Sequence, residues 1–130
     1  MAYSDEQKKR LLDLIEAWKE RLHMEAWHIE IQWDEEPSHP KAILQITPTD
    51  GREFAMLRVG SFFDDDLSEA ERQNAVCHEL LHCLFDRPWY GVNLLIRRLG
   101  ADASVLSDEM IRHDVEHFID HLAGVLAPLE

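Results

Sequence analysis

Five residues near the middle of the chain, reading HELLH over 78–82, constrain its fold more than any other stretch. On an α-helix, side chains four residues apart lie on one face about 6 Å apart, so a single ion can contact both His78 and His82. This is the spacing of a two-histidine zinc site. Glu79 lies about 100° further round the helix, within reach of a water held beside the ion. Its natural role there is that of a general base.

The residues around this motif predict the helix that it requires. Ser68 and Glu71 form the S-x-x-E pattern of a capping box, which predicts a helix start about ten residues before the motif. Pro88 predicts the helix end, because proline lacks the backbone N–H that the next turn needs. The buried stripe is expected to comprise Val76, Leu80 and Leu84, beside Leu81 and Phe85. A pair of solvated surface histidines is the alternative interpretation of the motif.

Composition and charge narrow the class of protein. A chain of 130 residues with 45% hydrophobic residues is expected to form a single domain over 1–130. Its 26 acidic and 13 basic residues give a net charge of -13, which disfavours binding to nucleic acid or anionic lipid. The sequence has no apolar run of membrane-spanning length, and its N-terminus is acidic and amphipathic rather than signal-like. We therefore expect a cytoplasmic protein.

Two cysteines, Cys77 and Cys83, flank the motif. Six residues apart on one helix, they point in different directions and cannot form a disulfide with each other. Thiolates bind zinc well, so a cysteine ligand is an alternative to consider. Neither cysteine has helical spacing to the face of His78 and His82, however, and we expect two buried thiols in a reducing compartment.

The segments before the motif predict one helix and three strands, and hence an α+β fold. Ser4 and Gln7 form a further capping box, and apolar residues recur at helical spacing to about His23. Residues 27–33 alternate between apolar and polar, which is typical of a half-buried strand. Residues 42–47 and 53–59 are expected to form a hairpin about the turn 48–51. The strand 53–59 is a candidate open edge that an extended peptide could join.

After the motif helix, the sequence predicts a loop over 89–93 and a short helix over 94–99 that ends at Gly100. Ser107 is expected to cap a last helix, which Pro128 closes. The expected buried stripe of that helix comprises Ile111, Val115, Phe118, Leu122 and Val125.

A catalytic zinc site takes three protein ligands and a water, so His78 and His82 leave one ligand to be found. The last helix carries five candidates within about two turns, namely His113, Glu116, His117, Asp120 and His121. Glu116 and Asp120 have i,i+4 spacing, which suits a ligating carboxylate and a second carboxylate that orients a histidine ligand. His113 lies on the same row of the helix. The donors considered for a developing oxyanion are Tyr90, His113, His117 and His121.

The HELLH motif, followed by Glu116-x-x-x-Asp120 on a later helix, resembles the HExxH plus ExxxD pattern of gluzincin zinc peptidases. The layout of the whole chain also resembles the small metallopeptidase-like proteins of bacteriophages and prophages. The resemblance implies a minimal zincin-like fold, with an N-terminal helix, a small three-stranded sheet, the HExxH helix and a C-terminal ligand-bearing helix. It implies Zn²⁺ bound by His78, His82 and Glu116, with Glu79 as base. No glycine and third histidine follow the motif closely, which excludes the metzincin arrangement.

The sequence thus predicts a zinc metallopeptidase of the HExxH type that acts on a peptide or protein substrate. The alternative is a non-catalytic zinc-binding module, structural or for protein interaction, whose acidic surface meets a basic partner. A closed structural site needs a fourth ligand and has no use for a base, so Glu79 favours the enzyme. Two further hypotheses, a metal-free adaptor and an acidic mimic of nucleic acid, are supported by the net negative charge alone.

Overall fold

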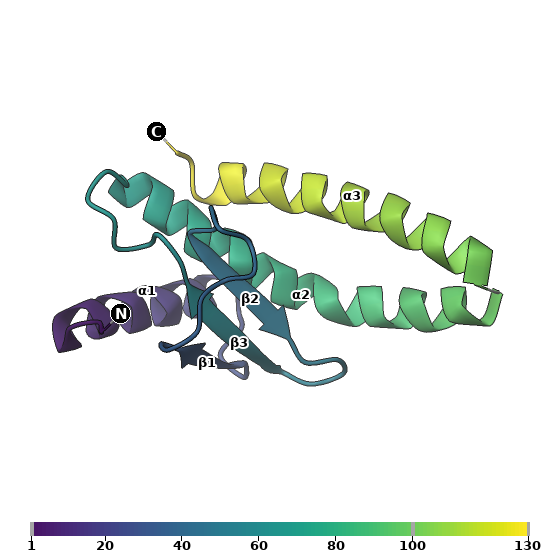
Figure 1. Cartoon of the computed structure of the whole chain (residues 1–130), viewed down its shortest axis with the longest axis horizontal. Helices are drawn as coiled ribbons and strands as arrows, with labels where there is room; N and C mark the ends of the chain where they lie inside the picture. The colour runs from purple at the N-terminus through teal and green to yellow at the C-terminus, as the bar shows by residue number, and fades with distance from the viewer. Residues whose placement is uncertain (1, 100, 130) are drawn as a thin grey trace.

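The chain forms an α+β fold with three helices and a three-stranded mixed sheet in its described part (Figure 1). The computed structural model describes residues 2–99 and 101–129, with side chains described outside 86–111. The elements are α1 Asp5–Arg21, β1 His28–Gln32, β2 Leu44–Pro48, β3 Phe54–Val59, α2 Glu69–Leu99 and α3 Ala101–Leu126. Within these described helices, no stretch is long and apolar enough to cross a lipid bilayer.

Helix α1 begins where the sequence predicts. The backbone N–H of Gln7 donates to the Ser4 hydroxyl at 3.1 Å, and the Ser4 N–H donates to the Gln7 side chain at 2.9 Å. This capping box satisfies two polar groups at the start of the helix. The buried face of α1, which includes Leu11, Ile15 and Trp18, then packs into the core.

The sheet has the order β1-β3-β2, with β1 parallel to β3 and β2 antiparallel to it. The predicted hairpin is confirmed, and its turn uses Gly51 at a positive φ of 74°. The prediction that 53–59 is an open edge is wrong, because β3 pairs on both sides. Its inward residues Ala55, Leu57 and Val59 are all at most 3% exposed, as suits a central strand. The edge strand beside the motif helix is β2.

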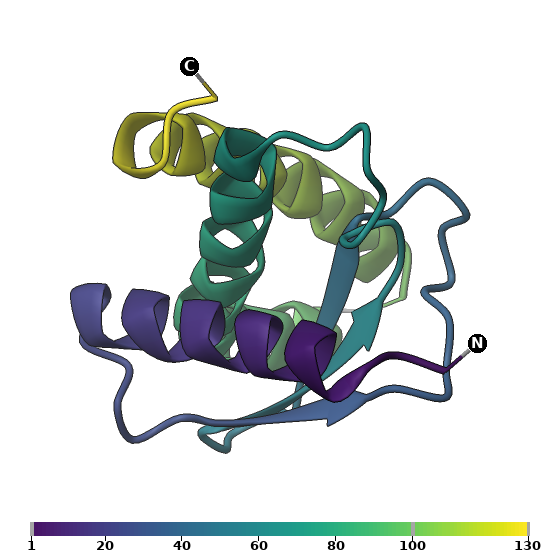
Figure 2. The same cartoon turned by 90° about the vertical axis from the view of Figure 1, so that its left-hand side faces the viewer.

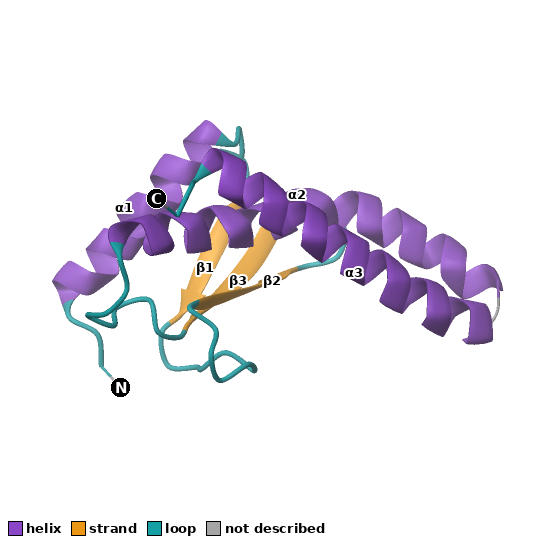
Figure 3. Ribbon diagram, turned by 90° about the horizontal axis from the view of Figure 1, so that it is seen from above, coloured by secondary structure: helices purple, strands orange, loops and turns teal. Residues whose placement is uncertain are grey.

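The helices lie on one side of the sheet (Figures 2 and 3), and the core of buried side chains draws on both layers. Residues from α1, β2, β3 and α2 meet in this core, which contains Ile15, Leu44, Leu57, Val76 and Leu80 among others. On the opposite face of the sheet, Met56 is 37% exposed. The HELLH turn therefore lies on a helix that the core holds against the sheet.

A buried arginine fixes the start of α2. The guanidinium of Arg72 donates to the carbonyl oxygens of Phe62 at 2.8 Å, Asp64 at 2.7 Å and Leu67 at 2.8 Å. These bonds order the link between β3 and α2. The predicted capping box is also confirmed, since the Glu71 N–H donates to the Ser68 hydroxyl at 3.1 Å and the Ser68 N–H donates to Glu71 at 3.2 Å.

The predicted ends of the later helices are wrong. Helix α2 continues through Pro88 to Leu99, so residues 89–99 form neither a loop nor a separate short helix. Helix α3 begins at Ala101 rather than at Ser107, and Gly100 lies outside the described residues. A proline inside a helix costs about 3 kcal/mol. Packing of α2 against the antiparallel α3 (Figure 1) offsets such local preferences.

Three of the apolar positions expected in the core lie outside it. In α3, Phe118 is 51% and Val125 63% exposed, while Ile119 and Ala123 are buried at 0% and 1%. A buried row that contains alanine lets α3 approach α2 closely, and the same rotation of the helix exposes Phe118. Likewise Leu84 of α2 is 38% exposed, and the side chain of Ile111 lies outside the described residues. Glu116 and Asp120 consequently flank the buried row, next to α2.

The close contact of β3 with the segment before β2 yields a stability prediction. A Cβ on Gly60 would lie 1.9 Å from the carbonyl oxygen of Ala42, whereas one on Gly124 in α3 would meet nothing within 4 Å. We expect Gly60→Ala to destabilise the fold by about 1–3 kcal/mol or more, since backbone must move. The control Gly124→Ala should stabilise it by roughly 0.5–1 kcal/mol. Urea denaturation measures both, and equal effects of the two variants would contradict this packing.

Candidate metal centre

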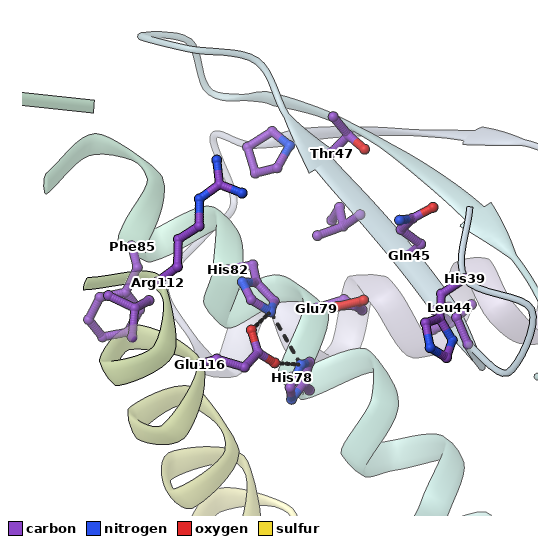
Figure 4. A pocket seen from close by; sticks show the side chains of 14 residues that line it. His39, Leu44, Gln45, Thr47, His78, Glu79, His82, Phe85, Arg112 and Glu116 are labelled. Carbon is purple, nitrogen blue, oxygen red and sulfur yellow. Dashed lines mark hydrogen bonds and ion pairs between the residues drawn. The ribbon is translucent and has the colours of Figure 1, made fainter. Parts of the chain in front are cut away.

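Helix α2 brings the two histidines of the motif together. His78 Nε2 and His82 Nε2 are 3.2 Å apart, and the two side chains are 22% and 29% exposed. Between them, Leu80 and Leu81 are each only 2% exposed, so the core fixes the rotation of this turn. The histidine pair thus lies at the surface of the core with its Nε2 atoms converging (Figure 4).

Helix α3 supplies a carboxylate at the same point. Glu116 Oε1 lies 3.1 Å from His78 Nε2, and Glu116 Oε2 lies 3.2 Å from His82 Nε2. The burial of Ile119 and the packing of α3 against α2 set this position, because Glu116 lies about one turn from Ile119 along α3. Among the five α3 candidates, Glu116 is the residue that bridges both motif histidines.

Asp120 contacts the other nitrogen of His78, with Oδ1 3.1 Å from Nδ1. A carboxylate is an acceptor, so His78 donates its Nδ1–H to Asp120. In the neutral ring this leaves a lone pair on Nε2, directed toward His82 and Glu116. Such a carboxylate–histidine contact fixes the tautomer and the ring orientation of metal-ligating histidines. Burial also lowers the pKa of His82, against the opposing effect of Glu116, which favours a neutral ring with a lone pair.

Glu79 occupies a different environment from Glu116. Its Oε2 atom is buried and has no hydrogen-bond partner among the described residues. Burial, and secondarily the charge of Glu116, raise the pKa of Glu79 to about 8, although a hydrogen bond from the backbone N–H of Ile46 opposes the shift. The two carboxylates are therefore unlike: one is half-exposed between two histidines, and the other is a buried group of raised basicity.

The donor atoms meet the requirements of zinc. With Zn–N and Zn–O distances of about 2.0–2.2 Å, ligands of a tetrahedral site are separated by about 3.3 Å. The separations here are 3.1–3.2 Å. Two neutral imidazoles and one carboxylate are the ligand set of a catalytic rather than a structural zinc site. Glu79 offers a carboxylate oxygen within 4.8 Å of ligand atoms of both histidines, and its Oε2 has no hydrogen-bond partner among the described residues, so it can accept a further proton donor.

A cleft of about 600 Å³ runs past this cluster, between the β2 edge on one side and α2 and α3 on the other (Figure 4). The N–H of Gly60 donates to Ile43 at 2.9 Å, and the N–H of Thr49 donates to Phe54 at 2.9 Å. The odd-numbered residues from Ile43 to Thr49, in and next to β2, thus direct their backbone N–H and C=O groups toward β3. Backbone alternation directs those of Leu44 and Ile46 toward the cleft.

The remaining sequence candidates lie elsewhere. The side chain of His113 is 72% exposed, and its Nδ1 lies 3.9 Å from Oδ1 of Asp114. The ring centroids of His113 and His117 are 4.7 Å apart. His121 is exposed, and none of these three histidines lines the cleft. The side chain of Tyr90 lies outside the described residues. Sequence reasoning missed Arg112, which lines the cleft one turn before Glu116; its i,i+4 spacing to Glu116 was the available signal.

The cysteines lie in the core, as the sequence predicts. Cys77 and Cys83 are free thiols with 0% exposure. Burial raises the pKa of Cys77 to about 11, so its thiolate is scarce at neutral pH. Their burial supports a packing role for both residues.

Known protein families, curated proteins and solved structures were each compared with the chain, and none matches it.

Proposed function

We propose that this protein is a zinc-dependent peptide hydrolase with a zincin-like arrangement, in which His78, His82 and Glu116 hold the metal. The observation that carries the proposal is the convergence of these three donors at 3.1–3.2 Å beside the buried carboxylate of Glu79, whose Oε2 has no hydrogen-bond partner among the described residues. A structural site would need a fourth ligand and would gain nothing from such a carboxylate. The α+β fold, with the motif helix against a small sheet, is compatible with this class.

When bound, zinc would polarise the substrate carbonyl and lower the pKa of a water in the cleft. Glu79 accepts a proton from that water as the water oxygen forms its bond to the carbonyl carbon. The amide C–N bond then breaks, and the proton passes from Glu79 to the leaving nitrogen, which departs as an amine. The raised pKa of Glu79, about 8, suits a group that takes up and returns a proton near neutral pH.

The edge of β2 is the proposed site for the substrate backbone. Leu44 directs its backbone groups into the cleft and Ile46 its carbonyl, whereas the Ile46 N–H is hydrogen-bonded to Glu79; the donor cluster lies across from this edge. An extended peptide can add to such an edge through main-chain hydrogen bonds. This replaces β3, the strand expected from the sequence. It favours a peptide or protein over a compact small molecule as substrate.

The first test is metal content together with turnover. Protein purified without added metal is expected to hold one zinc per chain by elemental analysis, and His78→Ala to hold none. A chelator should abolish cleavage of a peptide library, and added zinc should restore it. The exposed His28→Ala variant serves as the control. Zinc retained by the variant that lacks both His78 and His82 would contradict the site, and stoichiometric zinc without cleavage would favour the binding-module alternative.

A further inference from the structure

Arg112 is the only lysine or arginine among the described residues that line the cleft. It lies four residues before Glu116 on α3, so both side chains share one row of the helix. In Figure 4 its side chain extends past His82 toward the end of β2 that carries Thr47, whereas Glu79 lies on the opposite side of His82. A fixed positive charge and the proposed base thus flank the same histidine.

The reaction proposed above creates negative charge on the substrate oxygen. As the carbonyl carbon becomes tetrahedral, one electron pair of the C=O bond moves onto that oxygen. Apart from the proposed metal, the protein surroundings oppose this charge, because Glu116 and Asp120 lie close by and the chain carries a net charge of -13. A preorganised donor with a positive charge would therefore have a large effect at this position.

We propose that Arg112 is a catalytic residue of this hydrolase, whose guanidinium donates hydrogen bonds to the substrate carbonyl oxygen as negative charge develops on it. The inference rests on the proposed function and specifies how the same site works. Arginine suits the role because it stays protonated and presents five N–H donors in a rigid plane. Its position across His82 from Glu79 separates the oxyanion donor from the proton acceptor.

Four histidines and one glutamine near the cluster fit this role less well. His113, His117 and His121 do not line the cleft. The side chain of Gln45 is engaged with Ser38, to which its amide donates at 2.7 Å. His39 lies on the Glu79 side of the cleft in Figure 4 and accepts a hydrogen bond from the Lys41 N–H at 3.2 Å.

The test compares Arg112→Met, which removes charge and donors, with Arg112→Lys, which keeps the charge. One probe is a phosphonate peptide built on a sequence that the wild type cleaves, since its tetrahedral anionic group resembles the transition state. The other is the matching normal peptide, measured in a Glu79→Gln background where it is not cleaved. Calorimetry on zinc-loaded protein gives both affinities.

Arg112→Met should weaken phosphonate binding and lower kcat by about 10²–10³-fold. Its affinity for the normal peptide and its zinc content should stay unchanged. Arg112→Lys should recover part of the loss, and the neighbouring surface variant His113→Met should show none.

Three outcomes overturn the inference and separate it from the proposed function. Equal loss of affinity for both probes would show that Arg112 anchors the ground-state substrate, for example through a terminal carboxylate. Unchanged phosphonate binding and kcat, in a wild type that hydrolyses peptides, would remove Arg112 from the mechanism and leave the proposed function standing. A zinc-loaded wild type that cleaves no peptide in the library would overturn both proposals.

Discussion

Replacement of Glu79 by glutamine is expected to leave zinc binding intact and to lower peptide turnover by about 10²–10⁴-fold, the usual contribution of a general base. Glutamine keeps the shape of the side chain and can still accept the hydrogen bond from the Ile46 N–H, but it cannot take up a proton. Because Glu79 is not among the proposed ligands, zinc content should remain at one per chain. Elemental analysis and peptide cleavage, measured on the same preparation, separate the two properties.

The matched control for this experiment is Glu30→Gln, the same chemical change at an exposed position of β1. It should retain both zinc and turnover. Undiminished turnover in Glu79→Gln would exclude Glu79 as the base. Loss of zinc in that variant would instead show that Glu79 is a ligand, and the role of Glu116 would then have to be reassigned.

The same substitution has a second expected effect in metal-free protein. The folded-state pKa of Glu79 is about 8, against an ordinary value of 4.5, so ionisation of this buried group disfavours folding. Its contribution to stability is complete below about pH 4.5 and is lost as the pH rises toward about 8. Glu79→Gln should therefore gain stability over the wild type across this interval, by up to a few kcal/mol. Urea denaturation of both metal-free proteins at pH 5 and pH 8 measures the difference, and a pH-independent difference would contradict it.

Local signals explain most of what the sequence predicted correctly. The capping boxes at Ser4 and Ser68 and the alternation in 27–33 depend on residues within a few positions of one another. Such patterns act over one turn or one strand, so they predict α1, the three strands and the start of α2. The HELLH spacing likewise predicts the convergence of His78 and His82 from helix geometry alone.

The errors concern contacts between segments far apart in the chain. The sequence of β3 contains no pattern that predicts its position between β1 and β2. The sequence therefore could not identify β2 as the edge strand that lines the cleft. Pro88 does not end α2, and Ser107 does not begin α3, because the packing of α2 against α3 outweighs these local preferences. The rotation of α3 was misjudged by about one residue, because large apolar side chains were preferred to Ala123 as core. Glu116 and Asp120 nevertheless both lie beside His78, since their i,i+4 spacing keeps them on one face of the helix whichever row is buried.

Truncation of Glu116 is expected to weaken zinc binding by orders of magnitude. Its two oxygens lie 3.1 and 3.2 Å from the Nε2 atoms of His78 and His82, so Glu116→Ala would leave two ligands and an open side toward solvent. Asp120 contacts only Nδ1 of His78, and Asp120→Ala should weaken zinc binding by about 10–100-fold through the tautomer and orientation of that ring. Competition titration with a chromogenic chelator ranks these affinities.

The surface histidines of α3 provide both the control and the decisive alternative for this ranking. His121 is exposed and does not line the cleft, so His121→Ala should leave zinc affinity unchanged. A site with three histidine ligands would require α3 to rotate, because His113 and His117 contact each other on a side away from the cleft. That rotation would expose Ile119, which is fully buried. If His113→Ala or His117→Ala nevertheless costs more zinc affinity than Glu116→Ala, the two-histidine, one-glutamate assignment is wrong and the third ligand is a histidine.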